Sequence, residues 1–299
     1  MPLGVLFQRP TVAHLAELVA RPDVGEAASS LVPIQPRGAR PPLFCVHPAG
    51  GTVFCYRELA AALGDDQPLY GLQAQGVDGL LAPHARIEEM AAHYLRALRS
   101  VQPAGPYRLA GWSLGGNIAY EMACQLSEAS EEVALVALFD AGAIPPERER
   151  NEEDFLTMLL GLFSAEDRLS LERLRELSPE EQLAYFVDRA RQADLVAMPG
   201  ASAAGAQHVF DVFQANLQAV VDHVPRQYTG RVTLLKAAVQ SGDLCDDPLL
   251  GWGTHAAGGV ELHVIPGDHV HMLAPPSVRS VAECLALALR KSVVPTLVD

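Results

Sequence analysis

A serine flanked by glycines is the most informative feature of this 299-residue sequence. Gly111-Trp112-Ser113-Leu114-Gly115 matches the pattern G-x-S-x-G, in which the serine occupies a sharp turn between a strand and a helix. The flanking segments fit, because Tyr107 to Trp112 predicts a strand and Gly115 to Leu126 predicts a helix. Glycine has no Cβ and tolerates the strained backbone of such a turn. We therefore predict that Ser113 presents a nucleophilic hydroxyl.

A serine hydroxyl is a weak nucleophile and needs a positioned base. In the chain order that accompanies this kind of turn, the base is a histidine near the end of the chain. His269 follows the predicted strand Val260 to Ile265 and a Pro266-Gly267 turn, which places it at the edge of the sheet that also bears Ser113. We predict that His269 is the general base and that His271 is its competitor. A His-x-His pair can also bind metal, but no third ligand accompanies it, so no metal site is predicted.

The acid that orients the histidine has two candidates. Asp140 directly follows the predicted strand Val133 to Phe139, and Asp243 follows a later predicted strand, Val232 to Ala237. Either carboxylate can accept the Nδ1 hydrogen of His269 and stabilise the imidazolium that forms during the reaction. The residues alone leave this choice open.

Backbone N–H groups must stabilise the oxyanion of a tetrahedral intermediate. One comes from the residue after the nucleophile and the other from the loop after the first strand of the set, which points to Leu114 and Ala49. Gly50 and Gly51 allow that loop to approach closely. A glycine-rich turn can also cradle phosphate, but neither G-x-x-x-x-G-K-[ST] nor G-x-G-x-x-G occurs. We predict an oxyanion hole and no bound cofactor.

The elements that must position these residues alternate between strand and helix from Pro41 onward. This alternation predicts an α/β fold with a mostly parallel sheet flanked by helices. The remaining predicted elements are strands at Leu43 to Val46 and Leu69 to Leu72, and helices at Phe54 to Leu63, Ile87 to Val101 and Ser277 to Lys291. About 85 helix-patterned residues from Ile144 to Tyr228 are too many for a loop and predict an insertion.

The segment before Pro41 does not show the alternation of strands and helices. A short amphipathic helix is predicted to begin near Thr11. The residues from Arg21 to Arg40 are rich in Pro, Gly, Ala and Ser, and we interpret them as a linker.

Composition narrows the range of partners. The net charge of −14 and the lack of clustered Lys and Arg argue against a nucleic-acid partner. No apolar run reaches the roughly 18 residues of a membrane-spanning helix, and the N-terminus lacks the features of a signal peptide. We therefore expect a soluble, cytoplasmic protein without a membrane span. The five cysteines form no C-x-x-C pair or zinc-ligand spacing, so we expect buried thiols.

With these features in place, the chain resembles the type I thioesterase domains that close nonribosomal peptide synthetases and polyketide synthases. The resemblance covers about Pro41 to Arg290. It is carried by Phe44 to Gly51, Gly111 to Ala123, Leu138 to Asp140, and Gly267 to His269 with Met272. It implies an α/β-hydrolase fold with a helical lid and a Ser-His-Asp triad. In this family the acid follows the strand after the nucleophile helix, so the resemblance selects Asp140 and makes Asp243 the runner-up.

The resemblance also implies a domain organisation. Leu6 to Ala16 is similar to the closing helix of a peptidyl carrier domain, so residues 1–28 are expected to hold the end of that helix and a linker, and residues 29–299 the thioesterase domain. The chain would then be a piece of a larger synthetase. The upstream carrier domain of that synthetase would deliver the acyl chain on its phosphopantetheine.

The resemblance assigns the insertion, about residues 144–228, to a lid over the site. The expected lid helices are Glu153 to Gly161, Leu171 to Leu177, Glu180 to Arg191 and Gln207 to His223. Their apolar side chains would either contact a hydrophobic acyl chain or pack the helices together. These side chains are Phe155, Leu159, Leu160, Phe163, Phe210 and Phe213.

The expected activity is release of a peptidyl or depsipeptidyl chain through an acyl-enzyme on Ser113. We expect macrocyclisation, as in depsipeptide-cyclising thioesterases of the valinomycin synthetase type, and no residue pattern excludes hydrolysis. Two other hypotheses are a general serine esterase or lipase and an inactive binding module on the hydrolase fold. The carrier-like N-terminal segment and the long insertion argue against the first. The complete set of Ser113, His269 and Asp140 argues against the second.

Overall fold

The protein is built around a mostly parallel seven-stranded sheet. The computed structural model describes residues 30–143, 203–240 and 247–292, together with 172–173, 176–178, 181, 184–185 and 188. The strand order is β1-β3-β2-β4-β5-β6-β7. β1 is antiparallel to β3, and the other neighbouring strands are parallel. The strands are β1 (Leu31–Gln35), β2 (Leu43–Val46), β3 (Leu69–Leu72), β4 (Tyr107–Trp112), β5 (Val133–Phe139), β6 (Val232–Val239) and β7 (Val260–Asp268).

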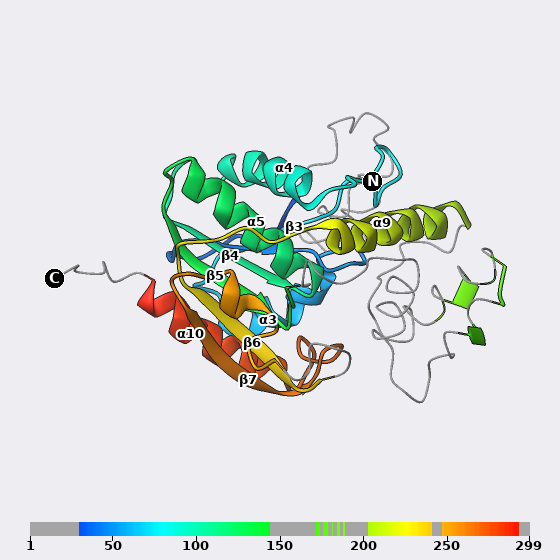
Figure 1. Cartoon of the computed structure of the whole chain (residues 1–299). Coiled ribbons are helices and arrows are strands. Elements are labelled where there is room, and N and C mark those ends of the chain that lie inside the picture. Colours follow the sequence, from blue (N-terminus) through cyan, green and yellow to red (C-terminus); the bar gives the residue numbers. More distant parts are fainter. Residues whose placement is uncertain are drawn as a thin grey trace.

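Helices cover both faces of this sheet (Figure 1). α4 and α5 pack against each other on one face, whereas α3 and α10 pack together on the other. α9 contacts α5 and extends beyond the sheet. The helices are η1 (Phe54–Tyr56), α3 (Arg57–Leu63), α4 (Ile87–Arg99), α5 (Leu114–Glu128), α9 (Ala203–Asp222), η2 (Trp252–Thr254) and α10 (Val278–Lys291). The α/β class and the mostly parallel sheet are as predicted.

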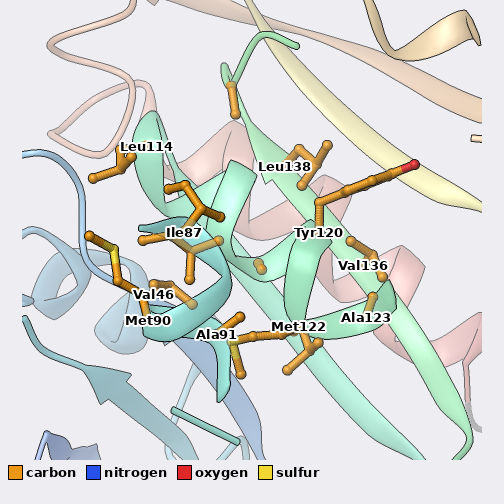
Figure 2. Close-up of a cluster of buried hydrophobic side chains, with 14 of the residues drawn as sticks. Val46, Ile87, Met90, Ala91, Leu114, Tyr120, Met122, Ala123, Val136 and Leu138 are labelled. Atoms are coloured by element: carbon orange, nitrogen blue, oxygen red, sulfur yellow. The ribbon is translucent and has the colours of Figure 1, made fainter. Parts of the chain in front are cut away.

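The core between α4, α5 and the sheet fixes the helix that follows Ser113. Ile87 and Met90 of α4 point toward α5 (Figure 2). On α5, Met122 lies on the side of α4, and Tyr120 lies on the side of Val136 of the sheet. All five side chains are buried, and full burial of an Ile, Met or Val side chain stabilises the fold by about 1.5–3 kcal/mol. Because most of α5 is buried, the position of its first residue is set by the core.

Two sequence-based assignments were wrong at the edges of the sheet. Leu31–Gln35, which we interpreted as part of a linker, forms β1 and pairs with β3. The predicted turn at Pro266-Gly267 is instead the last part of β7, which runs to Asp268. The helix predicted over Phe54 to Leu63 divides into η1 and α3.

The insertion is described only in part. α9 corresponds to the expected helix over Gln207 to His223. Its Phe213 is buried in the hydrophobic core that includes α4, α5 and the sheet, and its Phe210 is partly buried against the same core. Leu171 to Leu177 and Glu180 to Arg191 are described in part. The other named lid residues, which lie from Glu153 to Phe163, are outside the described residues. Over the part of the chain that the structure covers, no helix is both long and apolar enough to cross a membrane.

The cysteine prediction is confirmed in part. Cys45 and Cys124 are buried, whereas Cys55 and Cys284 are partly exposed. Cys245 lies outside the described residues.

Candidate active site

Ser113 lies in a strained turn between β4 and α5. Its φ of 56° falls in a region that residues with a side chain rarely adopt. A Cβ on Gly111 would lie 2.0 Å from the carbonyl oxygen of Gly115, and a Cβ on Gly115 would lie 2.3 Å from that of Val46. The two glycines therefore let the chain turn at once from β4 into α5 and let α5 begin against the end of β2.

Asp140 and His269 come together from the ends of β5 and β7. Oδ2 of Asp140 accepts a hydrogen bond from Nδ1 of His269 at 2.8 Å. The other carboxylate oxygen, Oδ1, accepts from the Ala237 N–H at 2.8 Å and from the Gln240 side-chain amide at 2.7 Å. Burial acts to raise the pKa of Asp140, but the hydrogen bond and charge of His269 and these two donors outweigh it, so the pKa is lowered. The carboxylate is therefore held ionised.

The alternative site residues are placed differently. His271, the competitor of His269, has a side chain that is 68% exposed, and its Nδ1 lies 2.8 Å from Oδ1 of Asp268. Of the two histidines it is His269 that lies against Asp140. Asp243, the other acid candidate, is outside the described residues.

Trp112 joins the His269 loop to the serine turn. Its indole Nε1–H donates to the carbonyl oxygen of His269 at 3.1 Å. The Trp112 and His269 rings lie with their centroids 5.5 Å apart and their planes tilted by 36°. Because Trp112 precedes Ser113, these contacts place the histidine beside the turn that carries the serine.

The two predicted oxyanion donors lie at the ends of β2 and β4. Ala49 belongs to residues 47–51, which we call the β2 loop, and Leu114 is the first residue of α5. The Tyr56 hydroxyl holds these ends together, because it donates to the Val46 carbonyl and accepts from the Trp112 N–H at 2.9 Å. Neither the Ala49 nor the Leu114 amide donates a hydrogen bond to another residue of the described part. The N–H groups in the first turn of a helix lack intrahelical acceptors, so Leu114 can donate to a ligand.

His47 stabilises the β2 loop from inside the protein. Its Nδ1 lies 2.8 Å from the Pro48 carbonyl oxygen, and its Nε2 lies 2.7 Å from the Tyr94 hydroxyl. Because a carbonyl oxygen only accepts, Nδ1 carries the hydrogen and Nε2 accepts from Tyr94. The ring is fully buried, and burial lowers the pKa of His47 to about 4. His47 is therefore a neutral structural histidine.

This buried histidine makes the stability of the chain depend on pH. In the folded chain the pKa of His47 is about 4, below its ordinary 6.5, so unfolding takes up a proton between these two values. Proton uptake by His47 should therefore lower the free energy of unfolding by about 3 kcal/mol as the pH drops from about 6.5 to about 4. We expect His47→Asn, which keeps an amide donor for Pro48 but cannot titrate, to show a flatter dependence. Urea unfolding at several pH values would give the free energy of unfolding of both proteins. The same pH dependence in the wild type and in His47→Asn would contradict this role of His47.

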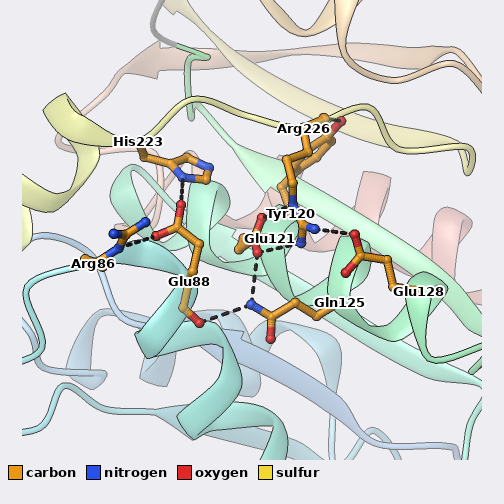
Figure 3. Close-up of polar contacts among 8 residues, drawn as sticks. All are labelled: Arg86, Glu88, Tyr120, Glu121, Gln125, Glu128, His223 and Arg226. Atoms are coloured by element: carbon orange, nitrogen blue, oxygen red, sulfur yellow. Dashed lines mark hydrogen bonds and ion pairs between the residues drawn. The ribbon is translucent and has the colours of Figure 1, made fainter.

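Polar contacts anchor the chain that leaves α9 (Figure 3). The Glu121 carboxylate, on α5 with its side chain 1% exposed, accepts from Arg226 at 2.7 Å and from Gln125 at 2.9 Å. His223 pairs with Glu88 of α4 at 3.0 Å. Glu121 and His223 are buried, whereas Arg226 and Glu88 are partly exposed, and a buried polar group that loses its partner is unfavourable. These contacts therefore hold the end of the insertion to α4 and α5.

The site contains contacts that the sequence analysis did not anticipate. Gln240 contacts Asp140, Trp112 contacts His269, and His47 contacts the β2 loop. Trp112 occupies a variable position of G-x-S-x-G and His47 lies in the segment Phe44 to Gly51, but no sequence signal marks Gln240. No group of three or more His, Cys, Asp or Glu residues suited to a metal ion occurs among the residues that the structure describes.

Comparisons with known proteins agree with the resemblance noted in the sequence. The model of the thioesterase domain family matches residues 41–287. The dimodular nonribosomal peptide synthase of Bacillus subtilis (strain 168) is 44% identical over 165 residues, which are 54% of this chain and 7% of that protein. Malpinin synthetase of Mortierella alpina is 34% identical over 302 residues, 98% of this chain and 4% of that protein. This chain thus spans less than a tenth of either synthetase.

A solved structure supports the same relationship. The Vlm2 thioesterase domain with genetically encoded 2,3-diaminopropionic acid, bound with a dodecadepsipeptide, is 25% identical with a TM-score of 0.66. The match covers 86% of this chain and 96% of that domain.

Proposed function

This chain belongs to the thioesterase domain family, and from that premise we propose that it releases a peptidyl or depsipeptidyl chain from the phosphopantetheine of a carrier domain. Thioesterases are hydrolases, so the chain is an enzyme domain. We assign Ser113 as nucleophile, His269 as general base and acid, Asp140 as the residue that orients His269, and the Ala49 and Leu114 amides as oxyanion donors.

In the first step the acyl chain moves from sulfur to oxygen. His269 Nε2 takes the proton of Ser113 while Oγ attacks the thioester carbonyl carbon. The Ala49 and Leu114 N–H groups stabilise the oxyanion. Collapse of the tetrahedral intermediate breaks the C–S bond, and His269 donates its proton to the departing sulfur, which leaves as the pantetheine thiol. An ester on Ser113 remains.

In the second step a nucleophile removes the chain from the serine. A hydroxyl or amine of the acyl chain gives its proton to His269 and attacks the ester carbonyl. Collapse breaks the bond to Oγ, and His269 returns the proton to Ser113. Water in place of the internal nucleophile would give a linear acid.

The observation that carries this proposal is the 2.8 Å contact between His269 Nδ1 and Asp140 Oδ2 beside the strained Ser113 turn. A buried, ionised carboxylate at Nδ1 fixes the hydrogen on that nitrogen and leaves Nε2 to accept a proton. The geometry therefore favours a working site over an inactive binding module. A general esterase shares this geometry, and the family match separates the two.

We propose macrocyclisation of a depsipeptide as the favoured outcome. The support is the likeness to the Vlm2 thioesterase domain, which was solved with a bound dodecadepsipeptide. A helical insertion that excludes water from the ester would favour an internal nucleophile over hydrolysis.

Product analysis tests the proposed function. We would offer the protein a hydroxyacyl-peptidyl N-acetylcysteamine thioester and the ethyl ester of the same acyl chain. The expected result is Ser113-dependent turnover of the thioester, with more cyclic product than linear acid. Linear acid alone would indicate hydrolytic release, and a preference for the ethyl ester would indicate an esterase. No turnover of any substrate would favour the binding module.

A further inference from the structure

A side chain of the insertion reaches the β2 loop through the interior of the protein. Nδ2 of Asn216, on α9, donates to the carbonyl oxygen of Ala49 at 2.9 Å. Asn216 is 1% exposed and Ala49 is 4% exposed. The partners are 167 positions apart in the chain, so this bond forms only when α9 is docked. Losing it would leave a buried carbonyl without that donor, which is unfavourable.

The face of α9 that carries Asn216 packs closely on the same region. His208, Val212 and Asn216 are spaced four residues apart and share one side of the helix. A Cβ on Gly51 would lie 2.6 Å from Cγ1 of Val212, and a Cβ on Gly79 would lie 2.2 Å from Cε1 of His208. Val212 thus lies directly against Gly51 of the β2 loop, and His208 lies against Gly79, which is outside that loop. A shift of α9 would displace the β2 loop.

Asn216 completes a set of contacts to both peptide groups of Ala49. The Ala49 N–H belongs to the same planar peptide as the Pro48 carbonyl, which lies within hydrogen-bond distance of His47 Nδ1 and accepts from the Gly51 N–H. The Ala49 carbonyl belongs to the next peptide, and Asn216 holds that one. Interior contacts therefore determine the direction in which the Ala49 N–H points.

We infer that Asn216 is a positioning residue for the Ala49 oxyanion donor, so that docking of the insertion helix sets the geometry of the oxyanion hole. The inference rests on the proposed function, in which the Ala49 N–H contacts the oxyanion. Donors act at 2.7–3.1 Å from the developing charge, and a misplacement of about 1 Å can cost about 100-fold in rate. Asn216 never touches the substrate; it acts through Ala49.

The test compares two neighbouring positions of α9. Asn216→Leu removes the donor with little change in volume, and Asn216→Ala is made alongside in case leucine does not fit. Leu217→Ala is the matched control, because Leu217 is buried on the same helix. We would measure kcat and KM with a short acyl N-acetylcysteamine thioester, the Kd of a boronic acid that forms a tetrahedral adduct on serine, and thermal stability.

We expect the Asn216 variants to lower kcat by about 10- to 100-fold while KM changes by no more than about twofold. The Kd of the boronic acid should rise in proportion to the loss of kcat. Leu217→Ala should lower stability and keep kcat within about threefold of the wild-type value. Asn216 variants that lose stability but keep both kcat and boronic-acid affinity would overturn the inference. A wild-type protein without Ser113-dependent turnover would refute the proposed function, and this role with it.

Discussion

Replacing Ser113 with alanine should lower kcat for a peptidyl thioester by about 10⁵- to 10⁶-fold. The alanine variant has no group to accept the acyl chain, so the two-step route is lost and only oxyanion stabilisation and substrate binding remain. The fold should be unaffected, because Ser113 makes no side-chain hydrogen bond that caps α5. Steady-state kinetics of both proteins would measure the loss.

Ser100→Ala is the matched control for this substitution. Ser100 is exposed at the end of α4, where its hydroxyl donates to the Ala97 carbonyl at 2.7 Å. We expect it to retain the wild-type rate. A Ser113→Ala protein with more than about 1% of wild-type kcat would show that another residue is the nucleophile.

Replacing Asp140 with asparagine should lower kcat by about 10⁴-fold. Oδ1 of Asp140 accepts from two donors, the Ala237 N–H and the Gln240 amide, so the remaining oxygen of an asparagine would occupy that position. Its NH₂ group would then face His269 Nδ1 and force that nitrogen to accept. The hydrogen would move to Nε2, which could no longer take the proton of Ser113. Kinetics at pH 7, with circular dichroism to confirm folding, would measure the effect.

Asp243→Asn separates the two acid candidates, and Asp268→Asn tests the carboxylate that contacts His271. Both variants should keep kcat within about threefold of the wild-type value, because we assign neither residue to His269. A large loss in Asp243→Asn together with a small loss in Asp140→Asn would reverse the assignment of the acid.

The part of the fold around Ser113 follows from local sequence. Strand, turn and helix lie within about twenty residues there, and the buried strands β2, β3, β4 and β5 have the predicted bounds. Buried parallel strands read as continuous apolar runs, so their ends are marked by the change to polar or glycine-rich sequence.

The errors fall on the edge strands β1 and β7. Pro33 lies inside β1, and Pro266 and Gly267 lie inside β7. Because proline and glycine are typical of linkers and turns, these segments were not predicted as strands. An edge strand tolerates proline, because one side of it has no neighbouring strand that needs its N–H. Whether a strand is at an edge depends on the order of the whole sheet, which local patterns do not reveal.

Site residues also differ in whether local sequence is enough to identify them. The turn at Ser113 carries its own signature, whereas a choice between Asp140 and Asp243 requires knowing which carboxylate meets His269 in space. The role of Asn216 is even harder to predict from the sequence, because nothing around it indicates contact with a residue 167 positions earlier. Contacts that depend on docking of the insertion could not be predicted from the sequence.

Mass spectrometry of the covalent intermediate is the most direct test of the central claim that Ser113 carries the acyl chain. The wild-type protein would be mixed with a peptidyl N-acetylcysteamine thioester, quenched with acid within the first turnovers, and analysed intact and after trypsin digestion. We expect a mass increase equal to the acyl group, located by fragment ions at Ser113 and lost in Ser113→Ala. An adduct at another residue, or product formation without any adduct at Ser113, would contradict the claim.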